Sequence, residues 1–274
     1  MKKVILKTLR QIDGTLDLKN ISLINAKKIN TKNIEKISLI YKNKEIKLSK
    51  IFSIKIIKTQ KEVNEINLKG CNSLCNYLGY KWKKDILTVE SNLGSYVGSK
   101  MEGGEIRVDG SVEDFLGSGM LGGKVIIKLN AKDYVGSASF GEKIGMNGGE
   151  ILISGNVGKY ACNFMRRGLV MVKGSVDAYS CYNMISGTLI VFENVEKNFG
   201  ISMKRGTLIF FKDNFIDDAN FVKTGEFDLS YLKLINKYLF DEYSIKLSTK
   251  KNKFIKYSGD RNLNGLGEVF VRKA

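Results

Sequence analysis

The sequence predicts an all-β protein, a right-handed parallel β-helix whose single-stranded coils are about 19 residues long. Six methionines recur at intervals of 19, 26, 19, 19 and 19 residues, and a glycine follows each of them by three positions. A short aliphatic segment follows every one of these glycines. A fixed period of this length is typical of solenoids. The methionines are Met101, Met120, Met146, Met165, Met184 and Met203, and the structural repeat glycines are Gly104, Gly123, Gly149, Gly168, Gly187 and Gly206.

The aliphatic segment of each repeat is expected to form one strand. Neighbouring copies cannot pair as antiparallel hairpins, because the same turn follows each strand, and the connections are too short for helical crossovers. Parallel stacking satisfies both constraints, with roughly 4.8 Å between rungs. The longest gap places a seven-residue insertion near residues 141–149. The strands are expected at residues 105–109, 124–128, 150–154, 169–173, 188–192 and 207–211.

Stacking brings equivalent residues of the six strands into columns. The second and fourth positions are apolar in every copy, so we expect their side chains to form the core. The second-position column is Ile106, Val125, Ile151, Val170, Leu189 and Leu208, and the fourth-position column is Val108, Ile127, Ile153, Val172, Val191 and Phe210. The repeat glycines are expected at tight corners that need a positive φ angle.

The third strand position is expected to face outward, because side chains alternate along a strand. Five of its six residues are nevertheless apolar, the exception being Arg107. An exposed apolar strip usually marks a covered face. The cover is either another subunit or the chain's own C-terminal segment, and a strand buried on both faces within one chain is the alternative. The candidate interface strip is Ile126, Leu152, Met171, Ile190 and Ile209.

The regions around the repeat divide the chain into three expected parts. Residues 1–70 are a small β-rich N-terminal cap, residues 71–213 the β-helix, and residues 214–274 a C-terminal extension. A cap is needed because the end coil of a solenoid exposes core side chains and unpaired backbone groups. Alternating segments predict strands near residues 3–7, 15–18, 37–41 and 54–57, a short helix over 24–34, and a degenerate first coil at 85–90.

The C-terminal extension is expected to hold one helix and a terminal strand. Leu232, Ile235 and Leu239 lie at helical spacing and predict a helix over residues 227–240, with Asp228 or Ser230 as its N-cap. Two strands, at residues 253–260 and 267–271, are expected to follow, joined by a Gly-containing loop. The helix and the last strand are candidates for covering the apolar strip.

The composition excludes several kinds of chemistry. The chain has no histidine, which removes His-containing metal sites, Ser–His–Asp nucleophiles and histidine acid–base catalysis. Its net charge of +17 is concentrated in residues 1–70, which hold seventeen Lys and Arg against six Asp and Glu. These cations are dispersed and are not interleaved with stacking aromatics, so nucleic-acid binding is not expected. The absence of a long apolar run and of a signal segment favours a cytoplasmic protein with no membrane contact.

Several local motifs are better explained by the repeat than by ligand binding. Residues 117–122 match G-x-G-x-x-G, but they fall where the repeat requires glycines. Cys71 and Cys75 lack the further thiolates of a cluster, and Cys162 and Cys181 are expected to be free thiols. An aromatic column is expected to pack as stacked rings. Its members are Tyr96, Phe115, Tyr134, Tyr160 and Tyr179.

Three arginines lie in the turns between methionine and glycine, namely Arg166, Arg167 and Arg205. Solvated turns are the simpler interpretation. A basic patch that contacts an acidic partner surface or a phosphate is the other.

The repeat, G-x-x-M-x-x-G followed by an aliphatic strand, resembles the GXGXG-type β-helix superfamily. That superfamily includes the C-terminal part of the large glutamate synthase polypeptide and the C-type subunit of formylmethanofuran dehydrogenase. The expected free-standing chain favours the latter, and so do residues 37–52, which are similar to its short β lobe. Residues 257–269 are similar to its C-terminal ending, and the insertion at 141–149 fits its lengthened coil. Cys162, Cys181 and Ser186 replace turn glycines of the superfamily pattern.

The resemblance implies a non-catalytic scaffold subunit of an archaeal oxidoreductase complex, formylmethanofuran dehydrogenase. That complex reduces carbon dioxide to formyl-methanofuran in the first step of methanogenesis. No catalytic, cofactor-binding or metal-binding residue carries over onto this chain. The complex is expected to hold tungstopterin or molybdopterin, iron–sulfur clusters and a dinuclear metal site in its other subunits, which are of molybdopterin and amidohydrolase type.

Two other functions stay open. One is a GXGXG structural subunit of a glutamate-synthase-like amidotransferase. The other is a stand-alone β-helix that binds polysaccharide or nucleic acid, which predicts an exposed aromatic or basic strip.

Overall fold

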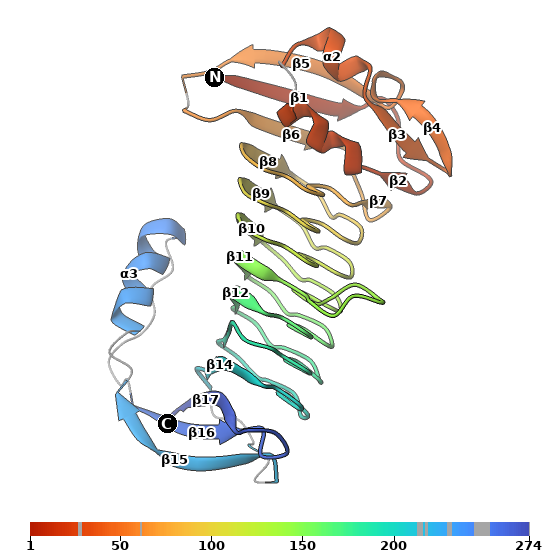
Figure 1. Ribbon diagram of the computed structural model, residues 1–274. Coiled ribbons are helices and arrows are strands. Elements are labelled where there is room, and N and C mark those ends of the chain that lie inside the picture. The colour runs from red at the N-terminus through yellow and green to blue at the C-terminus, as the bar shows by residue number, and fades with distance from the viewer. Residues whose placement is uncertain are drawn as a thin grey trace.

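The computed structural model describes residues 1–26, 29–60, 62–212, 216, 219–228, 232–243 and 253–273. Strands are the predominant regular secondary structure in this part of the chain. A 13-stranded sheet has the order β15-β16-β17-β14-β13-β12-β11-β10-β9-β8-β6-β1-β5. Figure 1 shows successive coils stacked along one axis, with the N-terminal lobe at one end and the C-terminal strands at the other.

The strands of the repeat pair in parallel, each with the equivalent strand of the next repeat. Val125, for example, pairs with Ile106 on one side and with Ile151 on the other. The expected register is therefore confirmed, including that of the degenerate first coil. These strands are β8 (Ile86–Val89), β9 (Glu105–Val108), β10 (Lys124–Ile127), β11 (Asn147–Ile153), β12 (Arg167–Val172), β13 (Thr188–Val191) and β14 (Arg205–Phe210).

A second wall of each coil is formed by a row of single parallel bridges. The row links Leu93, Val112, Ala131, Val157, Val176 and Val195 in order. Between the two walls lie the second-position and fourth-position columns, of which no residue is more than 1% exposed. The six repeat methionines are fully buried as well. Both core columns are thus confirmed, and they are the main source of stability, at roughly 1.5–3 kcal/mol of gross burial per side chain.

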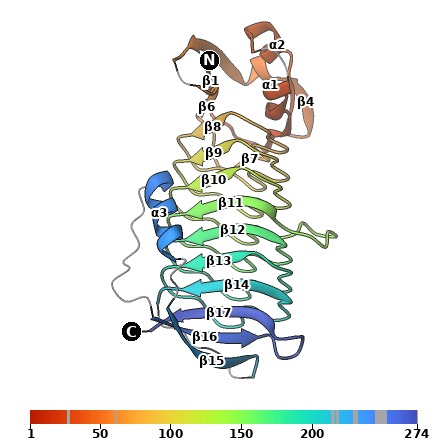
Figure 2. The ribbon, with the colours of Figure 1, turned by 60° about the vertical axis from the view of Figure 1, so that its left-hand side comes forward.

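The seven-residue insertion leaves the sheet register almost intact. β10 and β11 pair Lys124 with Glu150, so the added residues do not displace the strand. They form a loop beside the coil, which Figure 2 shows projecting from the stack near β11. Phe140 in this loop is 77% exposed. The insertion therefore changes one edge of the molecule and not its core.

The N-terminal region contributes to the same sheet. β6 (Glu65–Lys69) pairs in parallel with β8, and β1 (Lys2–Thr8) pairs in parallel with β6 and antiparallel with β5 (Phe52–Lys58). The cap is therefore continuous with the coils, which the repeat alone did not predict. A second sheet has the order β4 (Lys44–Lys47), β3 (Ser38–Tyr41), β2 (Leu16–Asp17), β7 (Cys75–Asn76).

Short helices complete the N-terminal lobe. The single helix expected over residues 24–34 is wrong: the chain forms α1 (Leu23–Ala26) and α2 (Thr31–Glu35) there. Asn30 caps α2, because its side chain accepts a hydrogen bond from the backbone N–H of Asn33 (2.8 Å). Two 3-10 turns, η1 (Lys19–Ser22) and η2 (Leu48–Lys50), lie beside them.

The C-terminal extension closes the other end of the stack. β17 (Leu266–Arg272) pairs in parallel with β14, in the place of a further coil, and β16 (Lys253–Gly259) and β15 (Phe221–Asp228) follow antiparallel. Both C-terminal strands expected from the sequence are confirmed. The helix α3 runs from Leu232 to Tyr243, so the expected start at residue 227 is wrong. Asp228 ends β15 instead of capping the helix, and Ser230 lies outside the described residues.

Candidate functional site

The repeat glycines hold the coils in close contact. All six have positive φ angles, from 76° at Gly104 to 117° at Gly206. A methyl group on Gly149 would lie 2.7 Å from the carbonyl oxygen of Gly123 and 2.7 Å from the Cε atom of Met120. The methionine of one repeat thus packs against the glycine of the next. These residues serve the coil corners, and the backbone near them bonds to the preceding coil, as Glu150 N–H does to Gly123.

The candidate interface strip is covered by the chain itself. Leu152 is 5% exposed, and Met171, Ile190 and Ile209 are fully buried. They form an apolar cluster with Phe254 of β16 and Phe270 of β17, and Tyr238 of α3 packs against it. Figure 2 shows α3 lying alongside the middle strands of the sheet. Of the two covers that the sequence left open, the chain's own C-terminal extension is the one that lies over these four residues, so they do not form a strip that is free for another subunit.

Ile126 is the member of the strip that stays half-exposed. Towards the N-terminus its column continues with Arg107, Thr88 and Asn67, as the strand pairing shows. The outer face of the sheet is therefore apolar over β11 to β14 and polar over β6 to β9. A hollow of about 350 Å³ lies on the polar half, and Lys3, Asn67, Arg107 and Ile126 are among its lining residues.

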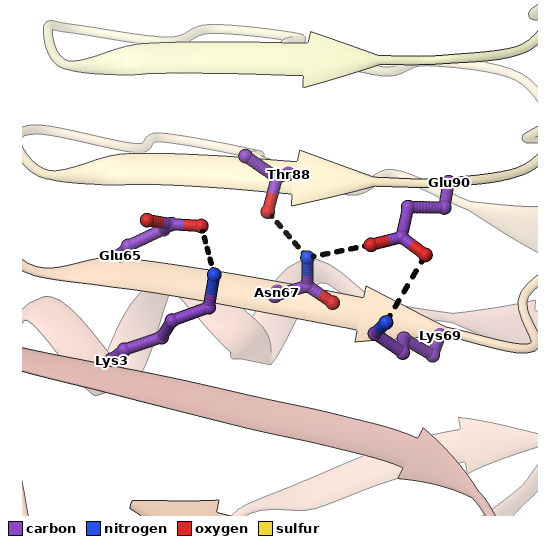
Figure 3. A network of polar contacts seen from close by, with 6 residues as sticks. All are labelled: Lys3, Glu65, Asn67, Lys69, Thr88 and Glu90. Atoms are coloured by element: carbon purple, nitrogen blue, oxygen red, sulfur yellow. Dashed lines mark hydrogen bonds and ion pairs between the residues drawn. The ribbon is translucent and has the colours of Figure 1, made fainter. Parts of the chain in front are cut away.

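A network of polar contacts spans this half (Figure 3). Lys3 Nζ lies 2.8 Å from Glu65 Oε1, and Glu65 is only 6% exposed. Asn67 Nδ2 donates hydrogen bonds to Thr88 Oγ1 (3.0 Å) and Glu90 Oε1 (3.3 Å). Asn67 Oδ1 is buried and has no hydrogen-bond partner among the described residues. The sequence did not single out these residues, because the repeat glycine that marks the register is absent before β6.

The charges in this network compensate one another. Lys69 Nζ lies 3.2 Å from Glu90 Oε2, and this hydrogen bond, together with that from Asn67, lowers the pKa of Glu90. The paired arrangement of Lys3 with Glu65 and of Lys69 with Glu90 leaves little net charge. Such a surface suits a polar protein contact better than the binding of a charged small molecule.

The aromatic column forms a continuous ladder along one corner of the stack. Six rings are stacked in order, with centroids 4.7 to 5.2 Å apart. They belong to Tyr77, Tyr96, Phe115, Tyr134, Tyr160 and Tyr179. The expected packing is confirmed, and Tyr77 extends it. Stacked rings turn their faces to one another, so the ladder offers edges and not the open faces that pack on sugars.

The cysteines are buried and unlinked. All four are free thiols, as expected for Cys162 and Cys181. Burial raises the pKa of Cys181 well above its ordinary value, so its thiol stays protonated and unreactive. Within the part of the chain that the structure describes, no three His, Cys, Asp or Glu side chains come together as metal ligands would.

Four cations gather on another edge of the stack. Arg166, Arg167, Lys204 and Arg205 line a hollow of about 580 Å³. All four are exposed. The sequence placed the three arginines in turns. The structure instead places Arg167 and Arg205 at the first positions of β12 and β14, and it brings all three arginines together with Lys204. None of the described helices is both long and apolar enough to cross a membrane.

The comparisons with known proteins agree with this architecture. A family model described as the GXGXG motif matches residues 86–237. No curated protein sequence matches the chain. A similar solved chain comes from the crystal structure of the formyltransferase/hydrolase complex (FhcABCD) from Methylorubrum extorquens in complex with methylofuran. It is 25% identical, with a TM-score of 0.82, and the match covers 98% of this chain and 100% of that one. The likeness therefore includes the N-terminal lobe and the C-terminal extension.

Proposed function

We propose a function for this chain from its family: the chain belongs to the GXGXG motif family, because the GXGXG motif model matches more than half of its length. The proposed function is that of a non-catalytic scaffold. The chain would serve it within a complex of several subunits that handles formyl groups on a methanofuran-type carrier. One observation carries this proposal. The whole chain, and not the repeat alone, matches a chain of the FhcABCD complex.

The more specific proposal is a place in formylmethanofuran dehydrogenase, which reduces carbon dioxide to formyl-methanofuran. In this proposal the tungstopterin or molybdopterin, the iron–sulfur clusters and the dinuclear metal site belong to molybdopterin-type and amidohydrolase-type partners in the cytoplasm. A formyltransferase/hydrolase complex is the second candidate, and the similarity to a chain of such a complex supports it. The two candidates share the role of this chain and differ in its partners.

A scaffold role is consistent with the chemistry of the chain. It contains no histidine, and the cysteines are buried thiols. We propose that the stacked coils are a right-handed parallel β-helix, with residues 1–70 and 214–274 as its two ends and residues 71–213 as its body. Two backbone walls and a filled core would make it a rigid platform. The half-exposed Ile126 and the neighbouring polar network are the part of the outer face that a partner would contact.

Two other functions receive less support. A GXGXG subunit of a glutamate-synthase-like amidotransferase would share the repeat, but the similarity to an FhcABCD chain also extends over the flanking regions. A stand-alone β-helix that binds polysaccharide would need aromatic faces open to solvent, whereas the rings of the ladder stack on one another.

Affinity purification of the tagged full-length chain from its source cells tests the proposal. Co-purification of molybdopterin-type and amidohydrolase-type chains would support the dehydrogenase. Formyltransferase and hydrolase chains without a molybdopterin-type chain would support the second candidate. A chain that purifies alone, or with amidotransferase subunits, would refute the scaffold role in a formyl-carrier complex.

The contact surface can be tested in the same preparation. Arg107→Glu reverses one charge on the polar half of the outer face, and Thr88→Lys adds bulk and a new charge beside it. These residues lie outside the core columns, so the fold should persist while partner recovery falls. Lys159→Glu and Lys44→Glu, at exposed positions elsewhere, are the control pair.

A further inference from the structure

The hollow beside β12 and β14 combines a concave shape with charge of one sign. It measures about 580 Å³, and the described residues that line it include no acidic side chain. Its charged lining residues are Arg166, Arg167, Lys204 and Arg205, and its neutral polar ones are Ser186 and Asn264. A cationic, partly apolar concavity is the general form of a site for an anionic ligand.

The repeat explains how the cations come together. The two positions before each repeat glycine are Arg166 and Arg167 in one coil and Lys204 and Arg205 two coils later. β12, β13 and β14 are paired in order, so these two cationic pairs lie two rungs apart, roughly 10 Å. The coil between them carries Ile185 and Ser186 at the same positions, and so adds no charge.

Among the six coils that a repeat glycine marks, the earlier ones have no equivalent of this arrangement. Their residues at the two positions are Glu102 and Gly103, Leu121 and Gly122, and Asn147 and Gly148. The degenerate first coil carries Lys83 and Lys84 there, but Lys83 Nζ lies 3.0 Å from Glu102 Oε2. Within the six marked coils the cations fall in the later ones, next to Leu263 and to Leu266 at the start of β17. These two leucines are 44% and 52% exposed and form an apolar side of the hollow.

The four cations have no counter-ion among the residues that the structure describes. In that part of the chain, no ion pair or side-chain hydrogen bond engages Arg166, Arg167, Lys204 or Arg205. Elsewhere on the surface, cations of this chain commonly have a carboxylate partner, as Lys100 has Glu142 (2.7 Å) and Lys212 has Glu193 (3.1 Å). Four neighbouring positive charges without compensation repel one another. A bound oxyanion would relieve that repulsion.

We propose that this hollow binds a ligand that carries at least two oxyanion groups, phosphate or carboxylate. One group lies between Arg166 and Arg167, and the other lies between Lys204 and Arg205. The planar guanidinium groups match both kinds of oxyanion with paired N–H donors. Ser186 and Asn264 supply neutral polar contacts between the two cationic pairs, and Leu263 and Leu266 contact the apolar part of the ligand. This site is separate from the polar network on the outer face of the sheet and does not depend on the scaffold role.

Isothermal titration of the purified full-length chain tests the site, with sodium tripolyphosphate and sodium citrate as probes at matched ionic strength. We expect at least one probe to bind with a dissociation constant below about 1 mM and to bind more weakly as sodium chloride is added. Tighter binding of tripolyphosphate identifies a phosphate ligand, and tighter binding of citrate identifies a carboxylate ligand.

The double variant Arg167→Gln and Arg205→Gln removes one guanidinium from each cationic pair. Binding of the probe should weaken by about tenfold or more, because bidentate guanidinium–oxyanion bonds are the strong ones. The control variant Lys159→Gln and Lys44→Gln removes the same charge from exposed positions outside the hollow. Circular dichroism and thermal unfolding check that both variants fold.

Two results would overturn the proposal. One is the absence of binding by either probe at low salt, which would leave the cations as a solvated edge or a contact for an acidic protein surface. The other is equal weakening by the two double variants, which would mean that the probes respond to net charge and not to the hollow.

Discussion

The hydroxyl of Tyr238 in α3 donates a hydrogen bond to Glu150 Oε2 in β11, 88 residues earlier in the chain. Lys124 Nζ of the neighbouring strand lies 5.3 Å from the centroid of the same ring. Tyr238 also packs against the apolar cluster formed by the strip. One side chain thus joins the C-terminal helix to the outer face of the sheet by a polar and an apolar contact.

Replacing Tyr238 by phenylalanine should loosen α3 while leaving the coils folded. The ring and its packing remain, but the hydrogen bond to a carboxylate is lost, at a cost of about 1 kcal/mol for a partly exposed pair. Helix opening is local, so amide hydrogen exchange in residues 232–243 should accelerate about fivefold, and the global unfolding midpoint should barely move. Tyr182→Phe, in the loop beside the aromatic ladder, is the control. Unchanged exchange in α3 would show that the hydroxyl does not hold the helix.

Ile190→Asp tests whether the strip is a core or a free surface. Ile190 is fully buried between the sheet and the C-terminal cover, so a carboxylate there would be buried without a partner. We expect a loss of roughly 3–5 kcal/mol in the free energy of unfolding of the isolated chain, measured by urea denaturation. Arg107→Asp, at the equivalent but exposed position of β9, should cost far less. Equal stability of the two variants would mean that the cover is not docked in solution.

The pKa of Asp13 is predicted to depend on Tyr41. The Tyr41 hydroxyl donates a hydrogen bond to Asp13 Oδ1, and the Lys42 ammonium lies 3.0 Å from Oδ2. These contacts lower the pKa of Asp13 from 3.8 to about 2. Because the pKa is lower in the folded state, the resulting stabilisation is complete above pH 3.8 and is lost as the pH falls towards 2.

Carboxyl NMR titration checks this dependence. Tyr41→Phe should raise the pKa of Asp13 towards 3.8, since the tyrosine hydrogen bond is the largest cause of its depression. Lys42→Met should also raise this pKa, because it removes both a hydrogen bond to the carboxylate and a favourable charge interaction. An unchanged pKa of Asp13 in Tyr41→Phe would contradict the assignment to the tyrosine hydrogen bond.

The coils were predictable because their register is marked in the sequence. Each repeat methionine packs on the glycine of the next coil. The regular spacing of methionines and glycines in the sequence therefore indicates a contact in the folded protein directly. β1 and β6 lack this mark, and alternation alone could not place them in the same sheet. For the strip, the sequence left open which segment covers it. The answer depends on pairs such as Glu150 and Tyr238, whose separation of 88 residues has no local signature.

The basic hollow, too, could be predicted only in part from the sequence. The repeat in the sequence predicts the positions of Arg167 and Arg205 in their coils, and its period predicts that they align two coils apart. The sequence does not predict the apolar side of the hollow, because Leu263 and Leu266 reach the hollow only through the pairing of β17 with β14. Local spacing therefore predicts the charges, and tertiary pairing creates the concavity.

Gly149 and Gly141 separate the two reasons for which this protein uses glycine. Their φ angles are nearly equal, 85° and 83°. A Cβ atom at Gly141 would have no neighbour within 4 Å, whereas one at Gly149 would lie 2.7 Å from the carbonyl oxygen of Gly123. Alanine at Gly141 should therefore cost only the left-handed backbone strain, about 1–2 kcal/mol. Alanine at Gly149 carries the same strain and also forces two coils apart.

We expect Gly149→Ala to lower the free energy of unfolding by roughly 3 kcal/mol or more, measured by urea denaturation beside Gly141→Ala. Trimming the neighbouring methionine in the double variant Gly149→Ala with Met120→Ala should not restore stability. One of the two contacts at 2.7 Å is a backbone oxygen that cannot withdraw, and the smaller side chain leaves a cavity. Equal losses for the two single variants would mean that backbone conformation alone requires these glycines. The spacing of the coils would then not depend on the glycine column.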